Sequence, residues 1–107
     1  MTRVALRPLA EAELVERTRH YRDVGGDDVA DRFFDAAVSA LTAIEEMPGI
    51  GTSQIGELIG VPGVRRVGVE GFPCGWYYFE RSEQIDVVRL LADRQHLAAL
   101  LDEDEPS

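Results

Sequence analysis

The feature that most constrains this sequence is an apolar stripe at helical spacing in its first half. Apolar residues recur here every three or four positions, and the set consists of Ala30, Phe33, Phe34, Ala37, Val38, Leu41 and Ile44. Pro48-Gly49 stops the pattern. A helix with such a stripe must bury it against another part of the chain. The stripe therefore predicts a helix over about residues 28–47 that packs on a larger apolar surface.

A second helical stretch precedes this one. Pro8 suits the first turn of a helix, the span Leu9–Val24 repeats apolar positions at spacings of three and four, and Gly25-Gly26 ends it. Two helices joined by a few residues form an antiparallel hairpin, here over about residues 9–24 and 28–47. We expect its buried contacts to be Phe33, Phe34, Val38, Leu41, Leu14 and Tyr21.

Four short runs have strand character. They are 3–7, 64–70, 74–80 and 85–91, and the last of these places Ile85, Val87, Arg89 and Leu91 on one face if it is regular. A glycine-rich loop with one helical turn around 55–59 precedes the last three, and residues 95–101 have the pattern of a short final helix. The predicted fold is α+β, in the order β-α-α-β-β-β, with the hairpin on a mainly antiparallel sheet. One domain is expected over 1–101, followed by an acidic disordered tail over 102–107.

Charge limits the partners. The chain has 107 residues and a formal net charge of −9, with twenty acidic residues, eleven arginines and no lysine. Proteins that grip nucleic acid by its phosphates usually carry a basic excess, so we expect no direct nucleic-acid binding by the free protein. Residues 63–96 are neutral, with five arginines and five acids, so any anionic target would have to meet this segment.

Cofactors, metals and membranes are not expected. Cys74 is the only cysteine, which excludes an internal disulfide and a cysteine-based zinc site. The acidic residues lack the spacing of a calcium loop. No apolar run is long enough for a membrane helix or a signal peptide, so cytoplasm is the expected location.

The ordered set of motifs resembles the ParE/RelE superfamily of toxins, and ParE more closely. The resemblance covers nearly the whole chain and includes Ala10, Glu13-Leu14, His20-Tyr21, Phe33-Phe34, Leu41, Pro48-x-x-Gly51, Arg65 or Arg66, Gly71-Phe72-Pro73, Trp76-Tyr77-Tyr78 and 85–91. One departure concerns the end of the last strand, where Ala92 stands in place of the family's usual His, although Arg94 is kept.

The resemblance implies the toxin of a type II toxin–antitoxin module. On this interpretation the protein is a non-hydrolytic inhibitor of DNA gyrase, held in a hetero-oligomer with a cognate antitoxin. The candidate target- or antitoxin-binding residues are Arg65, Arg66, Tyr78, Arg89 and Arg94. Two alternatives stay open: a RelE-like ribosome-dependent mRNA interferase, and an inactive member that only binds its antitoxin.

Each candidate also has an ordinary structural role to weigh. Arg89 can be a sheet-rim arginine paired with a carboxylate. Arg65 and Arg66 point to opposite faces of a regular strand. Trp76 and Tyr78 share one face while Tyr77 and Phe79 share the other, and most of these aromatics are expected in the core. Without a lysine or a His beside the last strand, we assign no catalytic residue.

Overall fold

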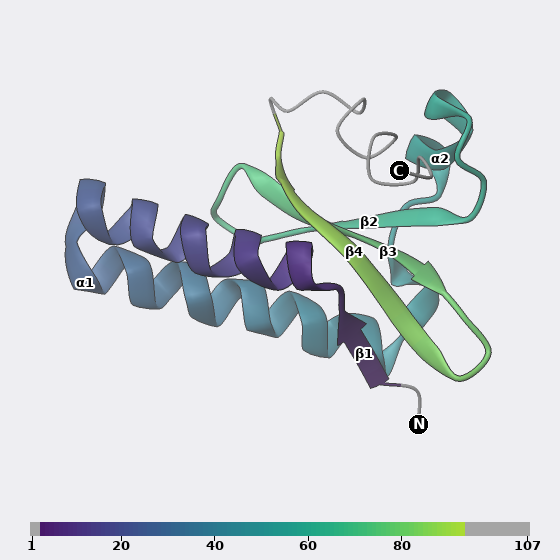
Figure 1. The fold of residues 1–107 in the computed structure, drawn as a ribbon, viewed down its shortest axis with the longest axis horizontal. Helices are drawn as coiled ribbons and strands as arrows, with labels where there is room; N and C mark the ends of the chain where they lie inside the picture. The colour runs from purple at the N-terminus through teal and green to yellow at the C-terminus, as the bar shows by residue number, and fades with distance from the viewer. Residues whose placement is uncertain (1–2, 94–107) are drawn as a thin grey trace.

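The computed structural model describes residues 3–93, and the chain runs through these elements in the predicted order (Figure 1). The elements are β1 (Arg3–Leu6), α1 (Pro8–Glu46), a 3-10 turn (Pro48–Ile50), α2 (Gln54–Ile59), β2 (Val64–Gly68), β3 (Cys74–Glu80) and β4 (Gln84–Ala92). The possible helix over 95–101 and the tail over 102–107 lie outside the described residues. No helix within residues 3–93 is long and apolar enough to cross a bilayer.

The two predicted helices form one hairpin that is continuous through its bend. α1 folds back on itself at Gly26, whose φ of 86° and ψ of 177° are not helical. Glycine adopts positive φ at little cost, so it serves here as the hinge between the two arms. The first arm follows β1, and the second arm ends where Pro48 starts the 3-10 turn.

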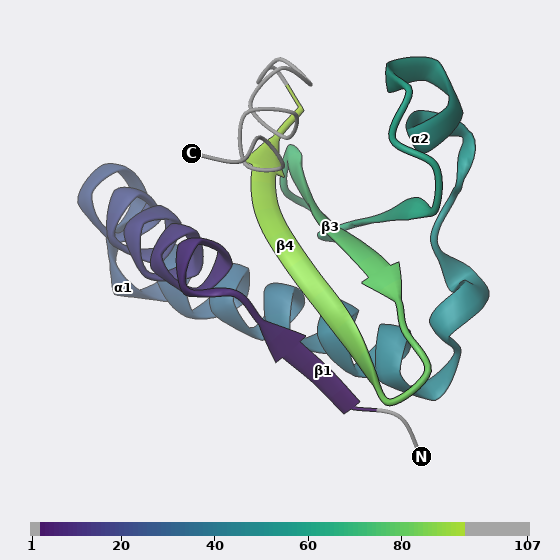
Figure 2. The ribbon, with the colours of Figure 1, turned by 45° about the vertical axis from the view of Figure 1, so that its right-hand side comes forward.

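The four strands form one mixed sheet in the order β1-β4-β3-β2. β1 pairs in parallel with the first half of β4, and the other pairs are antiparallel, as a mainly antiparallel sheet requires. α1 lies along one side of the sheet, while α2 lies on the other side (Figure 2). We call these sides the helix face and the far face.

The core is divided between the two faces. On the helix face, α1 contributes Phe33, Ala37, Leu41 and Ile44, and these pack with Trp76, Tyr78, Ile85, Val87 and Leu90. The Trp76 indole N–H also donates to the Ala37 carbonyl over 3.0 Å, which ties β3 to the helix backbone. On the far face, Tyr77 and Phe79 pack with Val64, Val88 and Leu91 under the loop that carries α2. The predicted division of the aromatics on β3 is therefore confirmed.

The predicted hairpin core is only partly right. Phe33 and Leu41 are buried, and Leu14 and Tyr21 are half-buried against the core. Phe34 and Val38 are 44% and 39% exposed, so their predicted burial is wrong. Phe34 shares a hollow with residues of the neighbouring arm instead of pointing to the sheet, which already receives Phe33 and Ala37.

The prediction that Ile85, Val87, Arg89 and Leu91 share one face of β4 is also wrong for the second half of the strand. Tyr77 lies opposite Arg89 while Tyr78 lies opposite Val87, so Val88 is an extra residue in β4. This bulge reverses the alternation, because two residues of one strand then oppose one of its neighbour. Ile85 and Val87 point to the helix face as expected, but Leu91 points to the far face.

Candidate target- and partner-binding residues

Tyr78 is a structural anchor for the turn that follows α1. Its side chain is fully buried; the hydroxyl donates to the Pro48 carbonyl over 2.7 Å and accepts from the Gly51 N–H over 3.0 Å. Burial raises the pKa of this hydroxyl above its ordinary value of about 10. A Cβ at position 51 would lie 2.6 Å from the Tyr78 oxygen, so glycine is needed for this close approach.

Arg65 holds the same turn from the neighbouring strand. It lies opposite Tyr78 in the β2–β3 register, and its Nη1 donates to the Gly51 carbonyl over 2.8 Å. The same Nη1 also donates to the Gly49 carbonyl over a longer distance of 3.4 Å. Two of the five candidates, Arg65 and Tyr78, are thus brought together, and both bind the backbone of residues 48–51.

Arg66 points to the opposite side of β2 from Arg65, as predicted. Its guanidinium lies 6.0 Å from the centre of the Tyr77 ring and forms an ion pair with Asp93, with Nη2 2.5 Å from the carboxylate. Gly75 provides the space, because a Cβ there would lie 2.8 Å from Cζ of Arg66. The Arg66 side chain therefore lies over the far face, and the Asp93 carboxylate neutralises its charge.

Arg89 forms a nearly buried ion pair with α1. Its Nη2 lies 2.6 Å from the Glu13 carboxylate and its Nε lies 3.0 and 3.1 Å from the two oxygens, with the side chains 11% and 16% exposed. The same carboxylate accepts the backbone N–H of Leu90 over 2.9 Å. β1 pairs with β4 only as far as Val87. Beyond that point, the Glu13 carboxylate replaces β1 as the hydrogen-bond acceptor for the backbone of β4 at Leu90.

The remaining candidate and the missing His fall at the end of β4. Arg94 lies outside the described residues. Ala92 is half-buried and lies opposite Cys74 in the register. The Cys74 thiol is buried, and burial raises its pKa, so it is a poor nucleophile near neutral pH. Cys74 is therefore a buried core residue of β3.

Arg66, Tyr77 and Arg89 lie in one row across β2, β3 and β4. Each arginine of this row forms an ion pair with a carboxylate, Arg66 with Asp93 and Arg89 with Glu13. Neither carboxylate was predicted as a partner from the sequence. Glu13 could have been found, because it is an acidic residue beside the sheet-facing positions Ala10 and Leu14. Asp93 offers no such signal, because it follows β4 with no periodic pattern around it.

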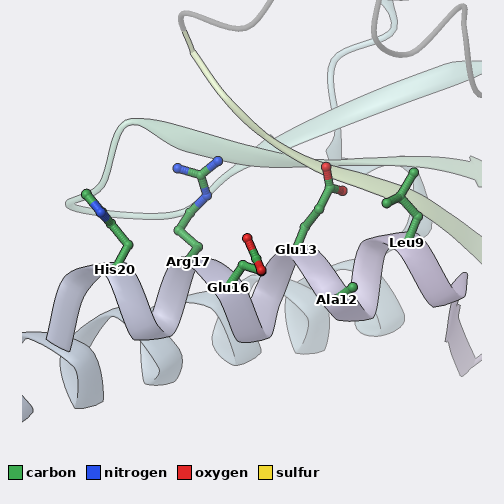
Figure 3. Close-up of a pocket in the computed structure, with 6 residues that line it drawn as sticks. All are labelled: Leu9, Ala12, Glu13, Glu16, Arg17 and His20. Atoms are coloured by element: carbon green, nitrogen blue, oxygen red, sulfur yellow. The ribbon is translucent and has the colours of Figure 1, made fainter. Parts of the chain in front are cut away.

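A shallow hollow of about 400 Å³ runs along the first arm of α1 beside β4. It is lined by Leu9, Ala12, Glu13, Glu16, Arg17 and His20. Figure 3 shows Glu13, Arg17 and His20 projecting from one side of this arm towards the strands. Within residues 3–93, no group of three or more His, Cys, Asp or Glu side chains comes close enough to hold a metal ion.

These observations define a class of protein by its fold. An α-helical hairpin covers one face of a mixed four-stranded sheet, as the resemblance to the ParE/RelE superfamily implies. Among solved structures, the chain is similar to one described as the chromosomal ParDE TA system from P. aeruginosa. The TM-score is 0.73 at 22% identity, over 86% of this chain and 96% of that one. The resemblance is therefore confirmed for the fold. No protein-family model matches the sequence, and no curated protein does.

Proposed function

We propose that this protein is the toxin of a type II toxin–antitoxin module, and that it acts as a ParE-like, non-hydrolytic inhibitor of DNA gyrase. The observation that carries the proposal is the fold shared with a chain of a ParDE toxin–antitoxin structure across nearly the full length of both. A cognate antitoxin neutralises the toxin by forming a hetero-oligomer with it. The four arginines and Tyr78 predicted from sequence enter this proposal through binding and structure rather than through turnover.

The environment of Tyr78 supports a toxin that does not cleave RNA. Cleavage at a ribose requires a group that removes a proton and another that supplies one. The Tyr78 hydroxyl already donates to Pro48 and accepts from Gly51, and its raised pKa makes it a still weaker source of a proton or of a phenolate. A guanidinium stabilises negative charge but is not a general base, so Arg65, Arg66 and Arg89 do not supply the missing group.

The charge of the hairpin supports a protein target over a nucleic acid. α1 carries ten acidic residues against four arginines. The arginines of β2 and β4 described above are already matched by carboxylates or carbonyl oxygens. A phosphate backbone would therefore meet a repulsive surface, while a basic partner would be attracted to it.

The test compares the two activities directly with purified toxin. Gyrase supercoiling should be blocked at a toxin concentration that leaves ribosome-bound mRNA intact in primer extension. Expression of the chain alone should arrest growth, and co-expression with the product of the adjacent small gene should restore it. Codon-specific mRNA cuts with normal supercoiling would replace this proposal with the interferase. Normal growth and unchanged supercoiling would leave only an inactive, antitoxin-binding protein.

A further inference from the structure

The Arg66 guanidinium is held in place on the far face by three neighbours. Its Cζ lies 6.0 Å from the centre of the Tyr77 ring, and its Nη2 lies 2.5 Å from the Asp93 carboxylate. Gly75 lies beneath it, where an added Cβ would come within 2.8 Å of Cζ. A ring, a glycine and a carboxylate therefore position a side chain that is still 27% exposed.

The strip of the far face beside this guanidinium carries no side chains at two facing positions. Gly68 and Gly75 lie opposite each other in the β2–β3 register, and Gly68 shares the face of Arg66 because the two are two positions apart in one strand. Gly68 is exposed on the edge strand of the sheet, and an added Cβ there would lie 3.6 Å from Nη1 of Arg66. A group from another molecule can therefore reach Nη1 across the two glycines. We call Arg66, Gly68, Gly75 and Tyr77 the arginine platform.

The guanidinium of the arginine platform uses only part of its hydrogen-bonding capacity. Nη2 donates to Asp93, whereas Nε and Nη1 donate to no group within residues 3–93. A guanidinium presents its N–H donors in a planar fork that matches a carboxylate bidentately. Asp93 shows that this fork accepts a carboxylate, but its side chain is 52% exposed, and exposed ion pairs contribute little to stability. A carboxylate that a rigid partner presents can therefore replace it.

The charges around the arginine platform indicate the class of ligand. The other arginines of β2 and β4 do not add to it, because Arg89 is bound to Glu13 and Arg65 points to the opposite side of β2. One exposed guanidinium matches a single carboxylate, whereas a nucleic-acid backbone presents a run of phosphates and is bound through several cations. The acidic hairpin α1 lies along the opposite face of the sheet (Figure 2). A single acidic side chain of a protein is therefore the ligand that fits.

We propose that the arginine platform binds an acidic side chain of the protein target, and that Asp93 is an internal carboxylate which this side chain displaces. The inference rests on the proposed function, under which the target is DNA gyrase. Arg and Tyr are enriched among the residues that dominate binding energy, and a side chain that is already positioned loses less freedom on binding. Tyr77 and Gly75 are positioning residues, since they hold the guanidinium and leave its Nη1 side open. The exchange replaces one ion pair with another, so the Arg66 charge is never left unpaired in the interface.

The experiment measures the affinity of the purified chain for the gyrase holoenzyme by surface plasmon resonance. Arg66→Gln should raise Kd by roughly 30-fold, and Arg66→Lys, which keeps the charge but loses the fork, by about tenfold. Asp93→Asn removes the competing carboxylate and should lower Kd by about fivefold. Arg81→Gln is the matched control, because Arg81 also lies over a ring of β3, 4.6 Å from the centre of Phe79, and is 53% exposed. This control should keep Kd within about twofold.

Gly75→Ala tests the arginine platform without changing the guanidinium itself. The new Cβ would push aside the flexible end of the Arg66 side chain, so the chain should stay folded while Kd rises by about tenfold. In Arg66→Gln the same glycine change should raise Kd no further, because both changes remove one contact. Increases that multiply in the double variant would overturn the role of Gly75.

The outcomes separate the inference from the proposed function. If gyrase does not bind the unchanged chain, the gyrase part of the proposed function fails and the ligand assigned here fails with it. If gyrase binds and both Arg66→Gln and Gly75→Ala keep the original Kd, only the arginine platform is overturned. Weaker binding by Asp93→Asn would overturn the displacement, because Asp93 would then belong to the contact itself. Loss of affinity for the product of the adjacent small gene, with gyrase binding unchanged, would overturn the choice of partner. Circular dichroism should show that every variant is folded, and tighter binding by Asp93→Asn cannot arise from misfolding.

Discussion

The Glu13–Arg89 ion pair should contribute strongly to the stability of the contact between the hairpin and the sheet. Glu13 serves two donors at once, since it binds the Arg89 guanidinium and the Leu90 N–H. Glu13→Ala would leave both donors without this carboxylate in a nearly dry setting. Breaking a buried pair by removing one partner costs about 3–5 kcal/mol. Because both side chains keep slight exposure, we expect the lower end, about 3 kcal/mol.

That loss is large for a chain of this size. Small domains have a free energy of unfolding of roughly 5–15 kcal/mol, so about 3 kcal/mol is a substantial part of it. The corresponding fall in Tm is roughly 10–20 °C. Glu13→Gln should cost less than Glu13→Ala, because its amide oxygen can still accept the Leu90 N–H. Urea unfolding followed by circular dichroism measures all of these variants.

A double-mutant cycle isolates the interaction itself. Glu13→Gln combined with Arg89→Met should give a coupling free energy above about 1.5 kcal/mol. The matched control is the exposed pair of Arg22 and Asp27, 3.5 Å apart near the bend, where Asp27→Asn should leave the unfolding midpoint unchanged. A coupling below about 0.5 kcal/mol at Glu13 and Arg89 would refute the reasoning, because the pair would then behave like a surface contact.

Three further experiments test the placement of single groups. Phe33→Ala should lower the free energy of unfolding by about 3–5 kcal/mol and Phe34→Ala by less than about 1 kcal/mol, so equal losses in urea unfolding would contradict their assigned burial. Gly51→Ala should cost more in the wild-type background than in Tyr78→Phe, because the added Cβ would collide with the hydroxyl; additive losses would argue against this contact. The folded state holds the Tyr78 proton more tightly than the unfolded chain does, so stability should fall as pH rises above about 10, and a titration of unfolding free energy should show a smaller slope for Tyr78→Phe.

The order and type of the elements could be read from the sequence because each leaves a local pattern. The break at Gly25-Gly26 and the stop at Pro48-Gly49 depend only on backbone chemistry, and both fall where expected. The division of Trp76 and Tyr77 between two faces follows from strand alternation in the same way. These signals involve neighbouring residues alone, so tertiary contacts did not alter them.

The environment of Arg89 could not be read in this way. A bulge is set by how two strands and a helix fit together, and Val88 carries no local mark of being the extra residue. Placing Arg89 correctly also required its partner Glu13, which lies 76 positions earlier in the chain. Alternation along β4 therefore predicted the right direction for Val87 and the wrong one for Leu91.

The failure at Phe34 and Val38 has a different cause. At 100° per residue, the apolar stripe from Phe33 to Val38 covers roughly 140° of the second arm. The core on the helix face buries the part of this arc that carries Phe33, Ala37 and Leu41. The rest of the arc, which carries Phe34 and Val38, stays in solvent. Periodicity marks a wide apolar arc but not how much of that arc the rest of the fold can cover, so the predicted burial of Phe34 and Val38 failed.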